Sequence, residues 1–275
     1  MLPNYQENAK PDETYPKARA MAEKALEIDP SLAEPHAAIG VVCHEYEWKF
    51  AEAEKEFKRA IELNPNYASA HQWYGEYLAN MGRRDESIAE MNRALELDPM
   101  SLIINTTMGG MYYAARRYDD SLAQFRKVFD IDPNFLKAHV QLISVYRAKG
   151  MYEEALDELR KTRELAGADM TKVDTRIDAV RAAYRANGPK GFWKAILDLQ
   201  LENARITKTE PDPFSVATCQ VGVGDNDAAI ATLQKAFESG NRKIGMVQMK
   251  TDPAWDPIRP DPRFQELLRK IGFPE

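Results

Sequence analysis

The sequence has little that would mark a secreted, membrane or zinc-binding protein. It contains two cysteines, Cys43 and Cys219, among 275 residues, and two cysteines alone cannot build a zinc site. We expect both thiols to be buried and free, in a reducing compartment. No run approaches the ~18 apolar residues of a membrane-spanning helix, and the first residues, MLPNYQENAKPDE, lack the basic-then-apolar pattern of a signal peptide. The expectation is a soluble, cytoplasmic protein without membrane contact.

The sequence also lacks an excess of positive charge, because 43 acidic residues outnumber 37 Lys and Arg and the formal net charge is -6. An acidic surface is a poor electrostatic match for a phosphate backbone, so we expect no direct nucleic-acid binding. The chain has no nucleophile-base motif, HExxH phrase, P-loop or dinucleotide fingerprint. Gly109–Gly110 and Gly222–Gly224 lack the strand context that such loops need. The prediction is a protein that is not an enzyme, with no catalytic residue and no cofactor.

Three of the four histidines, His36, His71 and His139, invite a metal hypothesis. Their separations are 35 and 68 residues, which places them at one position of a repeat with a period of about 34. Equivalent positions of stacked helices lie about 10 Å or more apart, so the three rings cannot converge on one ion at ~2.0–2.1 Å. Repeat register explains them, and we predict no metal site.

A 34-residue period dominates what the sequence does contain. Pro30, Pro65, Pro99 and Pro133 recur at intervals of 35, 34 and 34 residues, and they end the phrases EIDP, ELNP, ELDP and DIDP. Proline lacks an N–H and disfavours helical geometry in the residue before it, so a helix ends at each phrase. A fixed period of this length is typical of a helix-turn-helix array, which forms binding surfaces rather than chemistry.

Small residues recur at matching offsets in each period, where the first helix of a pair (helix A) would cross the second (helix B). Axes about 8–10 Å apart need small side chains at the contact. The triplets are Gly40, Ala53, Ala60; Gly75, Ser87, Ala94; Gly109, Ser121, Val128; and the bulkier Ile143, Ala155, Thr162. In these offsets the chain resembles the tetratricopeptide repeat family. The resemblance implies an all-α, right-handed superhelical solenoid of helix-turn-helix repeats, closed by a C-terminal capping helix.

The period divides the chain into segments. We expect an N-terminal arm and partial repeat over 1–32, with a lone helix B over 15–30. Four full repeats follow over 33–167, namely 33–67, 68–101, 102–135 and 136–167. A degenerate helical repeat over 168–209 contains two helices divided by NGPKG; then come a further repeat over 210–240 and a proline-rich loop with a capping helix over 241–275. The first full repeat has one extra residue, expected near Trp48.

Two longer phrases carry a second resemblance. They are NPNYASAHQWYGEYLANMGRRDESIAEMNRALELDPMSLIINT and DPAWDPIRPDPRFQELLRKIGFP. Both are similar to the C-terminal tetratricopeptide half of bacterial multidomain regulators, where it follows a winged-helix DNA-binding domain or a serine/threonine kinase. No winged helix, Gly-rich kinase loop or HRD phrase occurs in this sequence. The resemblance implies a sensory or docking module, cut from or descended from a larger bacterial regulator.

The candidate site is the concave groove lined by the A helices, which the tetratricopeptide resemblance implies. Groove-facing positions lie at fixed offsets from the small residue of helix A. Polar side chains there could hydrogen-bond an extended peptide backbone or grip a carboxylate; the alternative for each is an ordinary solvated surface. The selected residues are Glu45, Gln72, Glu76, Asn80, Thr106, Tyr113, Lys137, Ser144 and Arg147.

These features favour a non-catalytic scaffold that binds a protein or peptide partner in a preformed groove. One alternative is the regulatory half of a transcription factor or protein kinase. Another is self-association, as a homodimer, through the N-terminal partial repeat, whose lone helix B would leave an apolar face uncovered.

Overall fold

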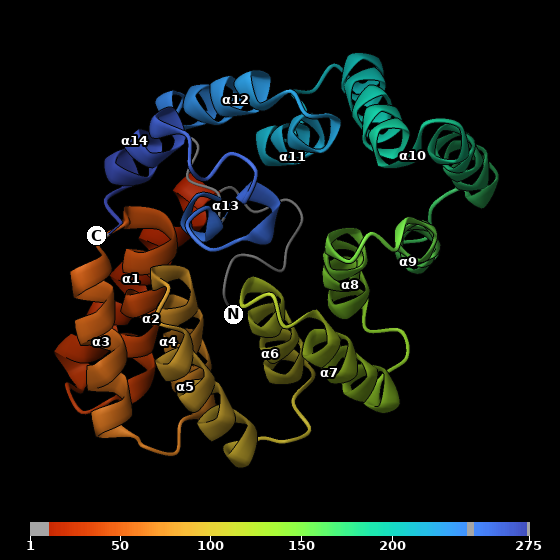
Figure 1. The fold of residues 1–275 in the computed structure, drawn as a ribbon. Helices are drawn as coiled ribbons and strands as arrows, with labels where there is room; N and C mark the ends of the chain where they lie inside the picture. The colour runs from red at the N-terminus through yellow and green to blue at the C-terminus, as the bar shows by residue number, and fades with distance from the viewer. Residues whose placement is uncertain (1–10, 241–244, 274–275) are drawn as a thin grey trace. The chain divides into compact units, whose positions relative to one another are not determined.

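The computed structural model describes residues 11–240 and 245–273, and every regular element within these ranges is helical (Figure 1). None of the helices in these ranges is long and apolar enough to cross a membrane. The elements are α1 (Pro11–Ile28), α2 (Ala33–Val42), η2 (Cys43–Glu47), α3 (Phe50–Leu63), α4 (Ala68–Met81), α5 (Arg84–Leu97), α6 (Leu102–Ala114), α7 (Tyr118–Ile131), α8 (Leu136–Ala148), α9 (Tyr152–Leu165), α10 (Met170–Thr207), α11 (Pro213–Val223), α12 (Asn226–Glu238), α13 (Gly245–Gln248), η3 (Pro253–Trp255) and α14 (Pro262–Ile271).

The chain forms two compact units. Unit 1 comprises residues 1–111, 242–251 and 268–275, and unit 2 comprises 112–241 and 252–267. The divisions fall inside α6 and α14, so they follow the packing of the chain and not the limits of the predicted repeats. The segmentation into repeats stays a prediction, as does the handedness of the superhelix.

In unit 1 the predicted small residues lie where paired helices meet. α2 packs on α3 and α4 packs on α5. A Cβ atom added at Gly40 would lie 2.7 Å from the Phe57 ring, and one added at Gly75 would lie 3.0 Å from the Met91 side chain. Glycine therefore allows the close approach of each pair, as the sequence predicts.

The extra residue of the first repeat is absorbed at the end of its helix A. Residues Cys43–Glu47 form a π-helical turn, and Trp48 follows in the left-handed conformation with φ 57°. A π-turn accommodates one more residue per turn than an α-helix. This confirms that the insertion lies near Trp48.

Aromatic stacking holds both ends of unit 1. The Tyr15 ring of α1 stacks on Tyr46 with centroids 5.2 Å apart, and Phe273 stacks on Phe50 of α3 at 5.1 Å. α1 packs on α2 but leaves two large apolar side chains in solvent, since Met21 is 74% exposed and Ile28 is 79% exposed. Residues 1–10, in which no helix A is expected, lie outside the described residues.

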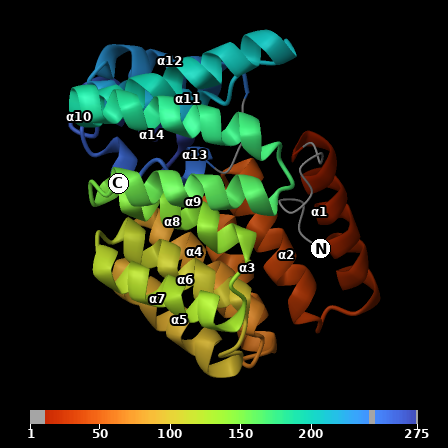
Figure 2. The ribbon, with the colours of Figure 1, turned by 90° about the vertical axis from the view of Figure 1, so that its right-hand side faces the viewer.

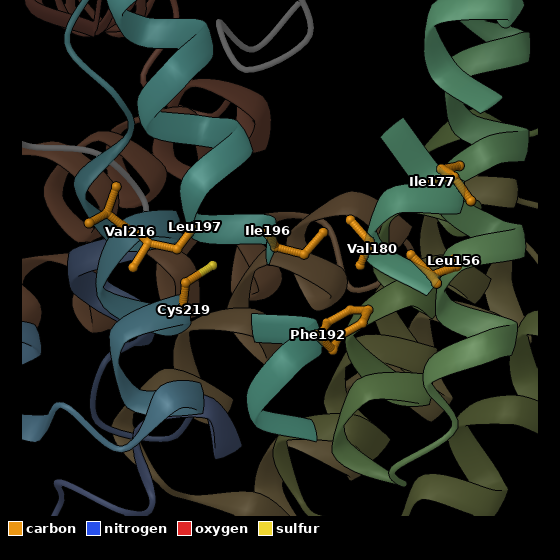
Figure 3. Close-up of a cluster of buried hydrophobic side chains, with 8 residues drawn as sticks. All are labelled: Leu156, Ile177, Val180, Phe192, Ile196, Leu197, Val216 and Cys219. Carbon is orange, nitrogen blue, oxygen red and sulfur yellow. The ribbon is translucent and has the colours of Figure 1, made fainter. Parts of the chain in front are cut away.

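Unit 2 continues the helix pairs. α8 lies beside α9 and α11 beside α12 (Figure 2). Within α10 the helix breaks at Gly188, whose φ of 60° and ψ of −151° are non-helical. The two halves on either side confirm the two helices predicted around NGPKG. Their inner faces share an apolar cluster with α9 and α11, and Figure 3 shows its residues: Leu156, Ile177, Val180, Phe192, Ile196, Leu197, Val216 and Cys219.

The segment 252–267 is part of unit 2. Asp261 caps α14, because the backbone N–H of Arg263 donates to its Oδ1 at 2.8 Å, and Pro262 is the first helical residue. Trp255 and Phe264 are buried, with ring centroids 6.5 Å apart. The predicted capping helix is therefore present, and it is tied to α12 by an ion pair of 2.6 Å between Arg263 and Asp227.

Candidate functional site

In unit 1, the groove residues of α4 form a hydrogen-bonded set with α6. Gln72, Glu76 and Asn80 are spaced by four residues, which places them on one helix face. Gln72 Nε2 donates to Glu76 Oε1 at 3.0 Å and to Thr107 Oγ1 at 3.2 Å. The Thr107 hydroxyl in turn donates to Glu76 Oε1 at 3.0 Å. Three polar groups on two successive A helices thus satisfy one another.

Asn80 and Glu45 make the corresponding links toward the N-terminus. Asn80 Nδ2 donates to His44 Nε2 at 3.2 Å, so His44 accepts at this nitrogen and is neutral. Burial alone lowers the pKa of His44 to about 3. Glu45 accepts a hydrogen bond from the Tyr15 hydroxyl of α1. The first contact joins two successive A helices of unit 1, and the second joins α1 to the end of the first A helix.

Three predicted groove residues are buried from solvent in this structure. Gln72 is 5% exposed, Glu45 is 8% exposed and Thr106 is 0% exposed. Gln72 and Glu45 are drawn inward by the hydrogen bonds just described, whereas the Thr106 hydroxyl has no hydrogen-bond partner. Expected surface positions have become contacts between helices. The residues that retain accessible surface are Glu76, Asn80, Tyr113, Lys137, Ser144 and Arg147.

The three histidines of the metal hypothesis each brace one helix pair. Nδ1 of His36 lies 2.6 Å from Glu56, that of His71 2.6 Å from Glu90, and that of His139 2.7 Å from Glu158. No group of three or more histidine, cysteine or acidic side chains within 11–240 and 245–273 could hold a metal ion. The repeat position carries a histidine–glutamate contact between helix A and helix B.

The second ring nitrogen of these histidines binds the proline phrase before helix A. His71 Nε2 lies 3.0 Å from the Pro65 carbonyl, and His139 Nε2 lies 2.9 Å from that of Pro133. For His71, the two acceptors favour the doubly protonated ring. Burial lowers the pKa of His71, but the hydrogen bonds to Glu90 and to the Pro65 carbonyl outweigh it and raise the pKa above its usual value.

In unit 2, Tyr113 is bound by the C-terminal segment. Its hydroxyl donates to Asp252 Oδ1 at 2.9 Å. The other contact of that oxygen is the backbone N–H of Ala254, also at 2.9 Å, so Asp252 caps the short helix η3. Burial raises the pKa of Tyr113 well above its usual value, and the neighbouring Asp252 charge adds to the rise. The hydroxyl remains a proton donor at neutral pH.

Arg147, on α8, is the unusual group of unit 2. Its guanidinium carbon lies 5.3 Å from the centre of the Trp193 ring and 5.7 Å from that of Phe192. Its Nε atom is buried and has no hydrogen-bond partner. Burial lowers the pKa of this guanidinium, and no carboxylate in the described part of unit 2 forms an ion pair with it.

The stabilisation of Arg147 by the two rings can be compared with the desolvation cost of its guanidinium. Cation–π contacts stabilise by about 0.5–2 kcal/mol. Taking an unpaired charge out of water costs several kcal/mol even after relaxation. The two rings therefore offset only part of the cost of burying the Nε side of the Arg147 guanidinium.

Lys137 and Ser144 share α8 with Arg147. They precede it by ten and three residues, which places Ser144 on the same helix face and Lys137 near that face. Both side chains are part-buried. α8 thus presents a hydroxyl and two cationic groups along one side.

Sequence reasoning missed the partners of these residues. Thr107 and His44 lie on A helices and could have been found by applying the same offsets more widely. Asp252 and Trp193 could not, because they are 139 and 46 residues from their partners in the chain, outside the repeat register. Only folding brings them to Tyr113 and Arg147.

Comparisons with known proteins agree with the repeat architecture. Residues 47–103 match the family model of the tetratricopeptide repeat. No protein of curated function is significantly similar in sequence.

Two solved structures have a similar fold. One is described as a functional characterisation of Pseudomonas aeruginosa pilF; it is 18% identical, with a TM-score of 0.53, and the alignment covers 78% of this chain and 89% of that one. The other is the APC/C hetero-tetramer Cut9–Hcn1, which is 12% identical, with a TM-score of 0.55, over 98% of this chain and 49% of that one. The predicted all-α repeat fold is confirmed: the chain has the fold of a helical repeat solenoid, and residues 47–103 are similar to the tetratricopeptide repeat.

Proposed function

We propose that this chain is a non-catalytic scaffold that binds a peptide or protein segment along its A helices. The observation that carries the proposal is the two-sided character of these helices. On α4, Gly75 and Leu78 are buried, and Gly75 lies against Met91 of α5, whereas Glu76 and Asn80 keep part of their surface in solvent. Part of the polar side thus stays accessible to a partner, although its side chains also hydrogen-bond to neighbouring A helices.

The proposed contact residues are the accessible members of the predicted set. They supply carboxylate, amide, hydroxyl and cationic groups, which suit main-chain and side-chain groups of an extended polypeptide. The net charge of -6 favours a protein or peptide over a nucleic acid. Because Cys43 and Cys219 are buried and free, the proposal places the protein in a reducing, cytoplasmic environment.

A random peptide library displayed on phage and selected against the full chain tests the proposal. Selected peptides should bind the wild-type protein and lose most of their affinity for a Lys137→Glu/Ser144→Arg variant, which alters the accessible side of α8. Arg163→Glu on α9 is the matched control, since Arg163 is exposed. Absence of any selected peptide, or equal loss in the control, would contradict the proposal.

The regulatory module of a larger bacterial protein is a finer form of the same proposal. It is supported by the two phrases that resemble the tetratricopeptide half of such regulators. An effector domain encoded in the same open reading frame would support it, and a reading frame without one would favour a free-standing adaptor.

Self-association is a second candidate, favoured by the exposed apolar side chains Met21 and Ile28 on α1. A homodimer that covers them would remove this surface from water. Light scattering over a range of concentrations tests it: a strict monomer at high concentration excludes this candidate.

A further inference from the structure

Building on the proposed function, we propose that Arg147 is a carboxylate subsite, which takes an aspartate or glutamate side chain from an acidic segment of the bound polypeptide. The subsite consists of the Arg147 guanidinium and the aromatic wall formed by Trp193 and Phe192.

The other partly buried arginines of unit 2 show what Arg147 lacks. Arg116 pairs with Asp256, and Arg181 pairs with Glu153, Asp157 and Asp178. Both partly buried guanidinium groups therefore form ion pairs with carboxylates of the same unit. Arg147 is the exception, because its Nε–H is buried and unsatisfied. A missing carboxylate is what a partner would supply.

The aromatic wall is held firmly in place. A Cβ atom added at Gly222 would lie 2.2 Å from the Trp193 ring, so this ring rests directly on the backbone of α11. Phe192 is fully buried, and the Phe192 and Trp193 rings meet edge to face at 5.2 Å. A guanidinium stacked on such a surface keeps its N–H edge oriented, which suits bidentate contact with a carboxylate.

The surroundings favour a carboxylate over other anions. One guanidinium matches the single negative charge of a carboxylate. Two acidic side chains of the unit itself are already held by polar side chains, in the segment Asp-Pro-Ala-Trp-Asp: Asp252 by the Tyr113 hydroxyl and Asp256 by Arg116. The charge of Arg147 opposes the rise in the pKa of Tyr113. A partner with a similar acidic segment would extend the same pattern.

A second buried polar group without a partner lies on α10, the helix that carries the aromatic wall. Gln200 Nε2 donates to Ser215 at 2.7 Å and lies 3.8 Å from Cys219 Sγ, while its Oε1 is buried without a partner. Burial raises the pKa of Cys219 to about 11, and the Arg147 charge opposes the rise. Arg147 thus offers an unsatisfied donor and Gln200 an unsatisfied acceptor, and a peptide offers the complementary pair in a side-chain carboxylate and a backbone N–H.

The test uses the peptides selected on the full chain, synthesised with amidated C-termini. Each acidic residue is replaced in turn by its amide, and affinities are measured for the wild-type protein and for Arg147→Met. One replacement should weaken binding to the wild type about tenfold or more, the value of one charge-assisted hydrogen bond. The same replacement should have little effect on binding to Arg147→Met. Arg176→Met, at an exposed position of α10, is the matched control and should behave as the wild type.

The outcomes separate the two proposals. Peptides that bind through α8 without coupling between any acidic residue and Arg147 would overturn the carboxylate subsite and leave the scaffold intact. Failure to select any peptide would overturn the scaffold itself and the subsite with it. Coupling to the terminal carboxylate of an unamidated peptide, and to no side chain, would overturn the side-chain assignment. If Arg147→Met does not fold, Arg147→Gln replaces it in the same cycle.

Discussion

The two units treat the same repeat position in opposite ways. Four residues after the small residue of helix A, the first repeat, in unit 1, has His44 and the fourth, in unit 2, has Arg147; the second and third repeats have Ala79 and Tyr113. His44 is neutral and accepts a hydrogen bond from Asn80. Arg147 is charged, and its guanidinium lies over the faces of the Phe192 and Trp193 rings without a carboxylate partner in the described part of unit 2. Equivalent positions in a repeat therefore share a location on the helix but not a chemical role.

The difference extends to the neighbouring polar groups. In unit 1 the predicted groove residues form hydrogen bonds with one another and with the next A helix, as Gln72, Glu76 and Thr107 show. Unit 2 interrupts the repeat with the kinked α10, whose Trp193 and Phe192 replace the polar partners that another A helix would offer. In the regular stretch the polar side chains satisfy one another, whereas the irregular stretch leaves the buried Nε of Arg147 without a hydrogen-bond partner.

The largest expected effect tests the irregular stretch. Phe192→Ala should lower the free energy of unfolding by about 3–5 kcal/mol, because a fully buried ring is lost and leaves a cavity. Hydrogen exchange of α9 and α10 amides would measure the local loss of protection. Phe57→Ala, fully buried in unit 1, is the control for a regular repeat. A change below about 1 kcal/mol for Phe192→Ala would contradict the packing described.

The second prediction compares Glu76, whose carboxylate accepts hydrogen bonds, with Arg147, whose buried Nε has no hydrogen-bond partner. Glu76→Met should lower the free energy of unfolding by about 1–3 kcal/mol, because the Gln72 and Thr107 donors lose their acceptor. Arg147→Met should leave it unchanged or raise it by up to about 2 kcal/mol, because an unpaired charge is removed from a buried site. Urea unfolding of both variants measures the contrast. Equal destabilisation by the two substitutions would remove the distinction between the units.

The third prediction concerns pH and unit 1. The pKa of His44 is about 3 in the folded protein, against 6.5 for the free side chain, so the unfolded chain binds a proton first as the pH falls. Stability should be full above about pH 6.5 and decline below it, with a slope of up to about 1.4 kcal/mol per pH unit from this residue. His44→Gln, which keeps an acceptor for Asn80, should flatten the decline measured by unfolding between pH 7.5 and 5. An unchanged slope would contradict a buried neutral His44.

His71 should have the opposite dependence. Its pKa is raised in the folded protein by Glu90 and the Pro65 carbonyl, against the effect of burial. Its contribution is therefore present in full below the pKa of the unfolded chain and is lost as the pH rises through the folded value. His71→Gln should reduce the loss of stability on the alkaline side of neutrality. The same series of unfolding curves, extended to pH 8.5, provides the measurement.

The smallest expected effect concerns an exposed ion pair of unit 2. Arg160 and Asp174 lie 2.7 Å apart with about half of each side chain in solvent. Exposed pairs contribute about 0.2–1 kcal/mol, so a double-mutant cycle with alanine should give a coupling energy in that range, reduced by salt. A coupling energy well above 1 kcal/mol would show that surface pairs, and not the buried groups, distinguish unit 2.

Much of the fold could be predicted because the repeat pattern is local. Pro65 and Pro99 end helices wherever they occur, Gly40 and Gly75 are needed wherever two helices touch, and Gly188 breaks a helix by its own backbone geometry. The candidate site could be predicted only in part. Tyr113 and Arg147 were selected from their offsets, and their place in a binding site stays a prediction; the burial of Gln72 and Thr106 depends on neighbouring helices that an offset does not describe.

The sequence by itself determined the helix pairs, their turns and the residues at which they cross, because these depend on contacts within about 34 residues. Tertiary structure alone decided which polar groups are satisfied. Hydrogen bonds and desolvation depend on what lies within a few ångströms, and for Tyr113 and Arg147 those neighbours come from Asp252 and Trp193, far away in the chain.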